Sequence, residues 1–269
     1  MHLTPESREA LERADEVLYL AADPLTAVWL GRLNSNSRSL HTFYAAGKDR
    51  KDTYDEMVDE ILAAVRKGDR VCVALYGHPG VFVMPSHEAV RRARLEGLEA
   101  RMLPAVSAED CLFADLGVDP GRAGCQSYEA TDFLIRPRKV ETSACLILWQ
   151  VGFLGMVDYS PDRADSRLPV LADYLRQLYP ADHPMTLYEA SPHPLFEPVI
   201  RHLELSKLAA AEPPAMTTLF IPPATVPQAQ IDAAVNKAVA HVQDQLVDLD
   251  YRNEQLTQAY MKNAGLVRQ

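Results

Sequence analysis

The sequence is poor in basic residues: 27 Lys and Arg stand against 37 Asp and Glu in 269 residues, a formal net charge of −10. Nucleic acids and anionic membranes are bound through clustered Lys and Arg, so this balance argues against both partners. A long hydrophobic run is also lacking. The longest run, near 144–157, contains Gln150 and two glycines and is shorter than the roughly 20 residues of a spanning helix.

Cysteines are few, and no two of them form a CxxC pair. This spacing argues against a zinc ribbon, a thioredoxin-like motif and a disulfide scaffold, and it suits a reducing compartment. The histidines lack metal-ligand spacing, so we expect no metal. The polar N-terminus does not resemble a signal peptide, and we expect a cytoplasmic protein. The four cysteines are Cys72, Cys111, Cys125 and Cys145.

The first half of the chain alternates short apolar runs with amphipathic segments. The run at 70–75 is almost continuously apolar, which is typical of a strand buried on both faces of a parallel sheet. The alternation predicts an open, mostly parallel α/β sheet with right-handed crossovers. The expected strands are 17–20, 40–43, 70–75 and 99–103, and the expected helices begin near Thr4, Asp23, Asp52, Pro85 and Ser107.

The rhythm changes near 119–124, where we place a domain boundary. We expect an N-terminal α/β domain at 1–120 and a second α/β domain with a mixed sheet at 121–224, its strands at 125–130, 145–150, 185–190 and 217–221. A helical tail at 225–269 carries a heptad-like stripe that packs on its own domain or on a second subunit. The stripe is Ile231, Val235, Val239, Val242, Leu246, Leu249, Leu256 and Tyr260.

Three loops follow expected strands. The glycine loop at 76–80 suits close approach of the backbone to a ligand at the carboxyl end of a strand, although a plain turn has the same pattern. Ser107 and Asp110 open a helix whose N–H groups could face a ligand, or they form an ordinary cap. Gln150 could meet the polar edge of a cofactor or make a structural hydrogen bond.

Arg50 and Tyr54 stand four residues apart at the start of an expected helix, so they share one face. A guanidinium beside a phenol favours the phenolate, which would make Tyr54 a base. A solvated arginine beside a half-exposed tyrosine is the alternative.

Taken together, six motifs occur in an order that resembles a known family. They are Arg-Lys-Asp-Thr-Tyr54, Leu-Tyr-Gly-His-Pro-Gly-Val-Phe82, Pro-Ala-Val-Ser-Ala-Glu-Asp-Cys-Leu-Phe-Ala-Asp-Leu-Gly117, Ser-Tyr-Glu-Ala130, Leu-Trp-Gln150 and Leu-Phe-Ile-Pro-Pro223. From about Thr4 to Ala224 the chain resembles the tetrapyrrole-methylase superfamily of S-adenosylmethionine (SAM) enzymes. Within it, the chain is most similar to the borosin (omphalotin-type) peptide backbone α-N-methyltransferases. The wider superfamily usually has an acidic residue at the position of His78, whereas Tyr-Gly-His-Pro-Gly is typical of the borosin branch.

The resemblance implies a two-domain α/β fold, a homodimer, and SAM bound between the domains and released as S-adenosylhomocysteine. It implies a catalytic pocket formed by Tyr44, Arg50, Tyr54 and Tyr76. It places the cofactor against Tyr76, His78, Pro79, Gly80, Val81, Phe82, Ser107, Ala108 and Gln150.

The implied chemistry suits these residue types. A peptide nitrogen is a poor nucleophile because its lone pair is delocalised into the carbonyl group. Tyr54, assisted by Arg50, is the expected base, and Tyr76 and Arg50 could hold the imidate oxygen.

Two features depart from the family pattern. The strand and glycine-containing turn that precede the first helix in that family have no counterpart here, and the tail lacks a small-apolar core peptide. The tail favours a split arrangement, in which the enzyme acts on a separate precursor peptide and a heterotetramer can form. The alternatives are a tetrapyrrole (precorrin/uroporphyrinogen-like) C-methyltransferase, a catalytically silent peptide-binding homologue, and self-methylation of the tail.

Overall fold

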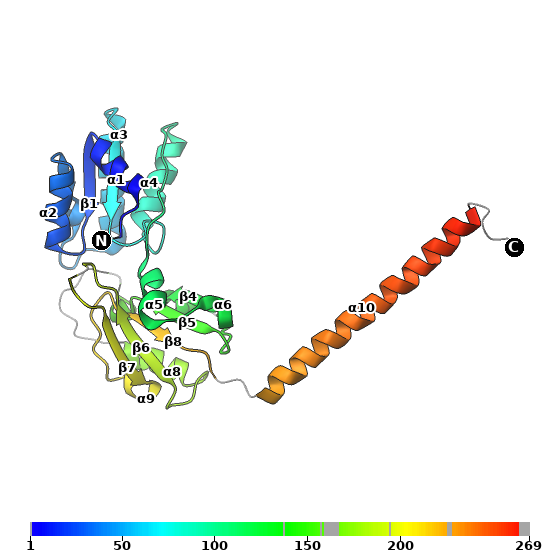
Figure 1. Cartoon of the computed structure of the whole chain (residues 1–269). Coiled ribbons are helices and arrows are strands. Elements are labelled where there is room, and N and C mark those ends of the chain that lie inside the picture. The colour runs from blue at the N-terminus through cyan, green and yellow to red at the C-terminus, as the bar shows by residue number, and fades with distance from the viewer. Residues whose placement is uncertain are drawn as a thin grey trace. The chain divides into compact units, whose positions relative to one another are not determined.

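The computed structural model describes residues 2–136, 138–156, 158, 167–193, 195–224 and 228–263. The chain divides into two compact units, Met1–Pro223 and Ala224–Gln269. The first unit contains two sheets, one formed before residue 120 and one after it (Figure 1).

The first sheet is parallel throughout. It has the order β2-β1-β3, formed by β1 (Glu16–Leu20), β2 (Ser37–Ser39) and β3 (Val71–Leu75). Helices α1 (Pro5–Arg13), α2 (Pro24–Leu33), α3 (Arg50–Arg66) and α4 (Met84–Leu95) surround it (Figure 1). Thr4 and Asp23 cap α1 and α2, each followed by a proline at the first helical turn.

Helix α3 supplies most of the core on one side of this sheet. Met57 and Val58 are fully buried against Leu18 of β1 and Leu40. Tyr44 and Tyr54 pack at the margin of the same cluster. The helix therefore fixes its first two turns, which carry Arg50 and Tyr54, against the sheet.

Three predictions for this half are wrong. Residues 40–43 form a 3-10 helix, η1 (Leu40–Phe43), because the Ser39 side chain accepts the His41 N–H and turns the chain out of β2. Residues 99–103 form no strand, since no described strand pairs with them. β3 is half-buried along its whole length, because β1 is its one partner among the described strands.

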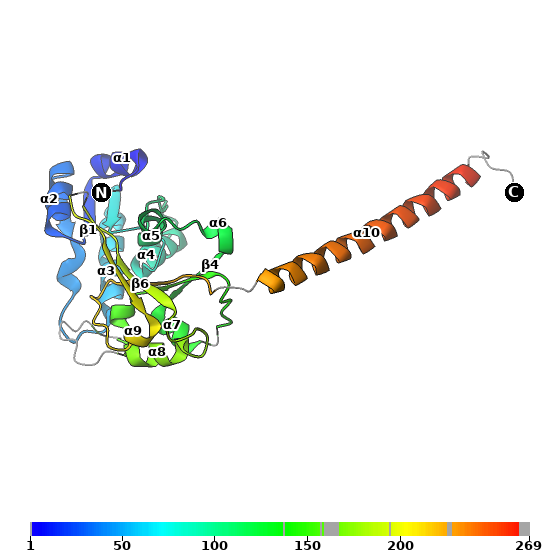
Figure 2. The same ribbon diagram turned by 60° about the horizontal axis from the view of Figure 1, so that its bottom comes forward.

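The second sheet is mixed, as expected. Its order is β4-β5-β8-β6-β7, formed by β4 (Cys125–Glu129), β5 (Cys145–Trp149), β6 (Pro184–Glu189), β7 (Val199–Glu204) and β8 (Thr218–Ile221). β4 and β5 are parallel and the other pairs are antiparallel. The short elements around it are α5 (Ala108–Leu116), α6 (Pro120–Ala123), α7 (Ala130–Ile135), η2 (Val151–Phe153), α8 (Leu168–Leu175) and α9 (Leu205–Leu208) (Figures 1 and 2).

Burial explains which strands could be predicted. All five residues of β5 are buried, and its continuous apolar run is evident in the sequence. β7 was missed because five of its six residues are exposed, and it therefore lacks an apolar run.

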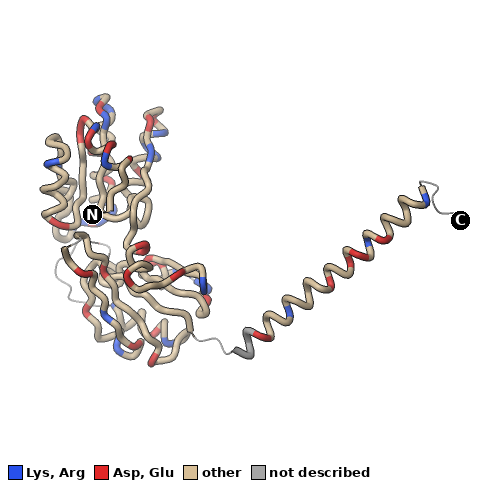
Figure 3. The backbone as a smooth tube through the Cα atoms, in the orientation of Figure 1, with Lys and Arg blue, Asp and Glu red and all other residues tan. Residues whose placement is uncertain are grey.

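In the described part of the second unit, the chain forms the long helix α10 (Gln228–Asn263). Its described side chains, at 232–263, are all exposed, and acidic residues outnumber the basic residues interspersed along it (Figure 3). Within the described residues, no helix is both long and apolar enough to cross a bilayer.

Candidate functional site

A cavity of about 470 Å³ lies where β4 and β5 end and α3 and α4 begin. Of the residues predicted for a site, it brings together Arg50, Tyr54, Phe82 and Gln150. Ligands of α/β sheets bind at the carboxyl ends of strands, and this cavity has that position. Its full lining is Arg50, Tyr54, Phe82, Val83, Met84, His87, Glu129, Thr131, Gln150 and Met156.

The start of α3 sets the positions of Arg50 and Tyr54. Asp49 is the N-cap residue, and its side chain accepts the Lys51 N–H at 2.6 Å. The helix therefore begins at Arg50, and Tyr54 lies one turn later on the same face. The Arg50 guanidinium carbon lies 4.1 Å from the centroid of the Phe153 ring. This cation–π contact holds the guanidinium at the wall of the cavity.

Three phenols gather beside Arg50. Tyr44 and Tyr54 pack edge to face, with ring centroids 6.5 Å apart. Burial raises the pKa of Tyr44 far above its ordinary value, and the nearby Tyr54 and Tyr76 raise it further. Burial also raises the pKa of Tyr76, while Arg50 opposes the shift. Tyr44 and Tyr76 therefore keep their protons at neutral pH and can act as hydrogen-bond donors.

The glycine loop after β3 is held by its own hydrogen bonds. Gly77 has φ +73°, a left-handed conformation that favours glycine. The Gly80 N–H donates to His78 Nδ1 at 2.9 Å. A Cβ on Gly80 would lie 2.9 Å from Met102 Sδ and 3.1 Å from the His78 ring, so only glycine fits without movement. His78 therefore helps to form the loop, and the hydrogen bond that its ring accepts from the Gly80 N–H fixes the orientation of the ring.

The loop ends in a strained residue. Phe82 has φ +54°, an uncommon conformation for a non-glycine residue. Its ring lies 4.9 Å from the Trp149 ring, yet 46% of the side chain remains exposed. Two side chains of α4 hold the loop through hydrogen bonds: Ser86 Oγ bonds to the Pro79 carbonyl group and His87 Nε2 to the Gly80 carbonyl group.

The start of α5 packs beside the loop. Ser107 and Asp110 form a reciprocal capping box. Hydrogen bonds from Ser107 lower the pKa of Asp110, and the nearby His78 adds to this effect. Ala108 packs in one apolar cluster with Val81 and Trp149. The predicted cofactor residues of the loop and of α5 therefore lie side by side, next to the cavity.

Gln150 turns the chain sharply after β5. It has φ +58°, and Val151 N–H donates to Thr217 O at 3.0 Å. Two residues later, a Cβ on Gly152 would lie 2.0 Å from Pro214 O. This close backbone approach places Gln150 in the cavity and Phe153 under Arg50.

The structure separates the predicted residues into two groups. Arg50, Tyr54, Phe82 and Gln150 line the cavity itself. The others are packed or electrostatically coupled around it: Tyr44, Tyr76, His78, Pro79, Gly80, Val81, Ser107 and Ala108.

Six lining residues were not predicted: Val83, Met84, His87, Glu129, Thr131 and Met156. The position of Glu129 at the end of β4, in the Ser-Tyr-Glu-Ala130 motif, was the signal that could have found it. Its carboxylate accepts the Asp132 N–H at 2.7 Å, so it also caps α7.

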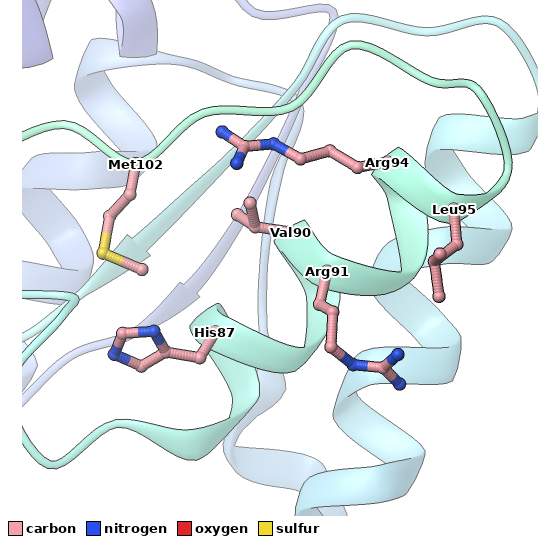
Figure 4. A pocket seen from close by; sticks show the side chains of 6 residues that line it. All are labelled: His87, Val90, Arg91, Arg94, Leu95 and Met102. Carbon is pink, nitrogen blue, oxygen red and sulfur yellow. The ribbon is translucent and has the colours of Figure 1, made fainter.

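A second cavity, of about 450 Å³, shares His87 with the first (Figure 4). It is lined by His87, Val90, Arg91, Arg94, Leu95 and Met102. Arg91 is paired with Glu88, and Arg94 donates to Ala100 O, so both guanidinium groups already have partners within the chain. In the part of the chain that the structure describes, no three His, Cys, Asp or Glu side chains form a group that could hold a metal ion.

A family model described as tetrapyrrole (corrin/porphyrin) methylases matches residues 1–191. Among curated proteins, the methyltransferase/ribosomally synthesized cyclic peptide gymnopeptides precursor of Gymnopus fusipes is 44% identical over 235 residues, which cover 86% of this chain and 56% of the relative. The corresponding omphalotin A precursor of Omphalotus olearius is 42% identical over 226 residues, covering 82% and 54%. The chain therefore spans about half the length of these relatives.

Solved structures show the same fold. The uroporphyrin-III-C-methyltransferase from Thermus thermophilus matches with a TM-score of 0.60 and 18% identity, covering 82% of this chain and 88% of that one. The methyltransferase CobJ matches with a TM-score of 0.56 and 19% identity, covering 83% and 89%. These matches confirm the predicted α/β architecture.

Proposed function

The chain belongs to the tetrapyrrole (corrin/porphyrin) methylase family, as its motifs predicted, and from this premise we propose that it is a SAM-dependent methyltransferase acting on backbone amide nitrogens of a peptide. The observation that carries the proposal is the Arg50–Tyr54 pair, which lines one cavity with Phe82 and Gln150. The peptide substrate is supported by the relatives, whose names join a methyltransferase to a cyclic-peptide precursor.

The methyl donor would lie against the loop and the ends of the strands. When bound, SAM supplies an electrophilic methyl group on a sulfonium and is released as S-adenosylhomocysteine. The exposed face of Phe82 and the Gln150 amide offer a stacking surface and a polar group beside it. Val81 and Ala108 add apolar contacts next to them. These residue types suit a purine, which has a flat face and a polar edge.

Tyr54 is the proposed base. A peptide N–H must lose its proton because the nitrogen lone pair is delocalised into the carbonyl group. The pKa values of Tyr44 and Tyr76 are raised, so both hold their protons, and Tyr54 is the phenol that lines the cavity together with Arg50. Acting as the phenolate, Tyr54 Oη would take the amide proton and become the phenol, and the freed nitrogen lone pair would attack the methyl group that SAM supplies.

Arg50 and Tyr76 are the proposed anchors of the peptide oxygen. Loss of the amide proton places negative charge on the neighbouring carbonyl oxygen, and fixed donors at that point stabilise it. Phe153 holds the Arg50 guanidinium in place, so this donor needs little reorganisation. The resulting alignment of nitrogen and methyl group accounts for a further share of the rate.

The proposed assembly is a homodimer that methylates a separate precursor peptide, and a heterotetramer forms when each subunit binds one peptide. The test is incubation of the purified protein with SAM and the candidate precursor, followed by mass spectrometry of both chains. Methyl groups on the peptide support the proposal. Methyl groups on the enzyme indicate self-methylation, and methylation of uroporphyrinogen in a parallel reaction indicates the tetrapyrrole alternative.

A binding measurement separates the silent homologue from an enzyme lacking its substrate. Calorimetry with S-adenosylhomocysteine should give saturable binding that is weakened by Gln150→Ala. Absence of binding by the wild-type protein contradicts the proposal.

A further inference from the structure

Helix α10 carries an apolar seam that its charged residues avoid. The helix has 36 residues and so extends about 54 Å. From Val235 to Tyr260, seven large apolar residues lie at spacings of four and three, with one step of seven, and each keeps between 49% and 70% of its surface exposed. Val247 and Tyr251 lie off this seam. An isolated helix with such a seam gains its stability by burying the seam against a partner.

The spacing assigns each residue to a position of the heptad repeat, written a to g. The d positions are Val235, Val242, Leu249 and Leu256, and the a positions are Val239, Leu246, Asn253 and Tyr260. The seam therefore covers nearly four heptads with one polar interruption. A single asparagine at an a position selects two-stranded pairing and fixes the register, because each amide finds its partner only in the same amide of the other helix.

The charges also favour a second copy of the same chain. Seven charged residues lie between 235 and 263, and five of them occupy the outer positions b, c and f: Lys237, Asp244, Asp248, Glu254 and Lys262. Of the two beside the seam, Arg252 is paired with Asp248 of its own helix at 2.7 Å. The other, Asp250, faces Gln245 across a parallel pair. No like charges therefore meet, although the whole chain carries −10.

We propose that α10 pairs with α10 of a second copy of this chain in a parallel, in-register, two-stranded coiled coil, with Asn253 facing the same asparagine of the second copy. An antiparallel pair would place a positions opposite d positions and would bury the Asn253 amide against an apolar side chain, which is costly. The interface is defined by α10 alone and does not depend on the methyltransferase activity.

Cysteine cross-linking of the full chain tests the pairing and its direction. Val242→Cys and Leu256→Cys introduce seam cysteines, and Asp244→Cys and Gln258→Cys place matched controls at the outer f position. After equilibration in a glutathione redox buffer, both seam variants should form disulfide-linked dimers and both controls should remain unlinked. In an antiparallel pair that joins residue 235 to residue 260, residue 242 lies opposite residue 253 and residue 256 lies opposite residue 239. Each introduced cysteine is then at least about 16 Å from its own copy, and neither seam variant is linked.

Analytical ultracentrifugation measures how much the seam contributes to the affinity of the dimer. Leu246→Asp places a charge in the seam, and Val247→Asp places the same charge on the outer face one residue later. Leu246→Asp should weaken dimerisation about a hundredfold or more, because each dimer loses two buried leucines, whereas Val247→Asp should match the wild type. Circular dichroism confirms that each variant keeps its helix.

The cross-linking and sedimentation results together decide whether α10 pairs with α10 of a second copy. Seam-specific cross-links support the proposal, even where a second surface also holds the dimer. A wild-type monomer, or cross-linking that is equal at seam and outer positions, overturns it. α10 then covers its own first unit or binds the precursor peptide.

Discussion

Gly152 offers a sharp test of how the cavity is built. A Cβ at this position would lie 2.0 Å from Pro214 O, 2.7 Å from Pro214 C and 3.0 Å from Ala215 Cα. All three atoms belong to the backbone, so no side-chain rotation relieves the contact. Gly152→Ala must move η2 or the segment at 214–215. We expect a loss of about 1–3 kcal/mol, the usual cost of overpacking.

Gly31→Ala is the matched control. Gly31 lies within α2, and the nearest atom to its added Cβ, Ser37 Oγ, is 3.8 Å away. The same added methyl group should therefore stabilise the protein by about 0.5–1 kcal/mol, because alanine has the higher helix propensity.

Thermal unfolding followed by circular dichroism measures both changes. For a chain of this size, a loss of about 2 kcal/mol lowers Tm by roughly 4–8 °C. Gly152→Ala should therefore melt several degrees below the wild type and Gly31→Ala slightly above it. Equal Tm values for Gly152→Ala and wild type would refute the close approach of Gly152 to Pro214, and with it the account of how Gln150 and Phe153 are positioned.

Three further predictions concern single groups. Arg50→Lys should reduce methylation at least about tenfold with peptide binding largely retained, because an ammonium lacks the planar stacking on Phe153, and equal rates would contradict this role. The hydrogen bond from Arg70 lowers the pKa of Asp15 to about 2, so the Tm difference between wild type and Asp15→Asn should be constant above about pH 5 and shrink progressively as the pH falls from about 5 to below 2; an undiminished difference at the lowest pH would contradict it. Burial raises the pKa of Cys125 to about 12, so iodoacetamide at pH 8 should label it at least about 100-fold more slowly in the folded than in the denatured protein, as measured by mass spectrometry; equal rates would contradict its burial.

The elements predicted from sequence are those with strong local signals. Thr4 and Asp23 are N-cap residues, each followed by a proline, and this pattern predicted the starts of α1 and α2. The apolar run at 145–149 predicted β5. The four-residue spacing of Arg50 and Tyr54 correctly placed both on one face. α3 begins two residues earlier than expected because Asp49 supplies the cap.

The features that the sequence did not reveal depend on tertiary contacts. Phe153 meets Arg50 only because β5 ends beside the start of α3, and no local pattern links the two residues. Phe82 and Gln150 adopt left-handed backbone conformations. Because neither residue is a glycine, the sequence does not predict this conformation at either position. β7 is mostly exposed, so the apolar pattern missed it, and 99–103 was wrongly predicted as a strand because its apolar residues pair with no described strand.

The most direct test of the proposed chemistry compares the wild type with Tyr54→Phe, each co-expressed with the candidate precursor peptide, by tandem mass spectrometry. The substitution removes one hydroxyl group and leaves the ring that packs against Tyr44. The account predicts methyl groups on backbone nitrogens with the wild type and a loss of about 10²–10⁴ in rate with Tyr54→Phe, while binding of S-adenosylhomocysteine is unchanged. Equal methylation by both proteins would contradict the role of Tyr54 as the base.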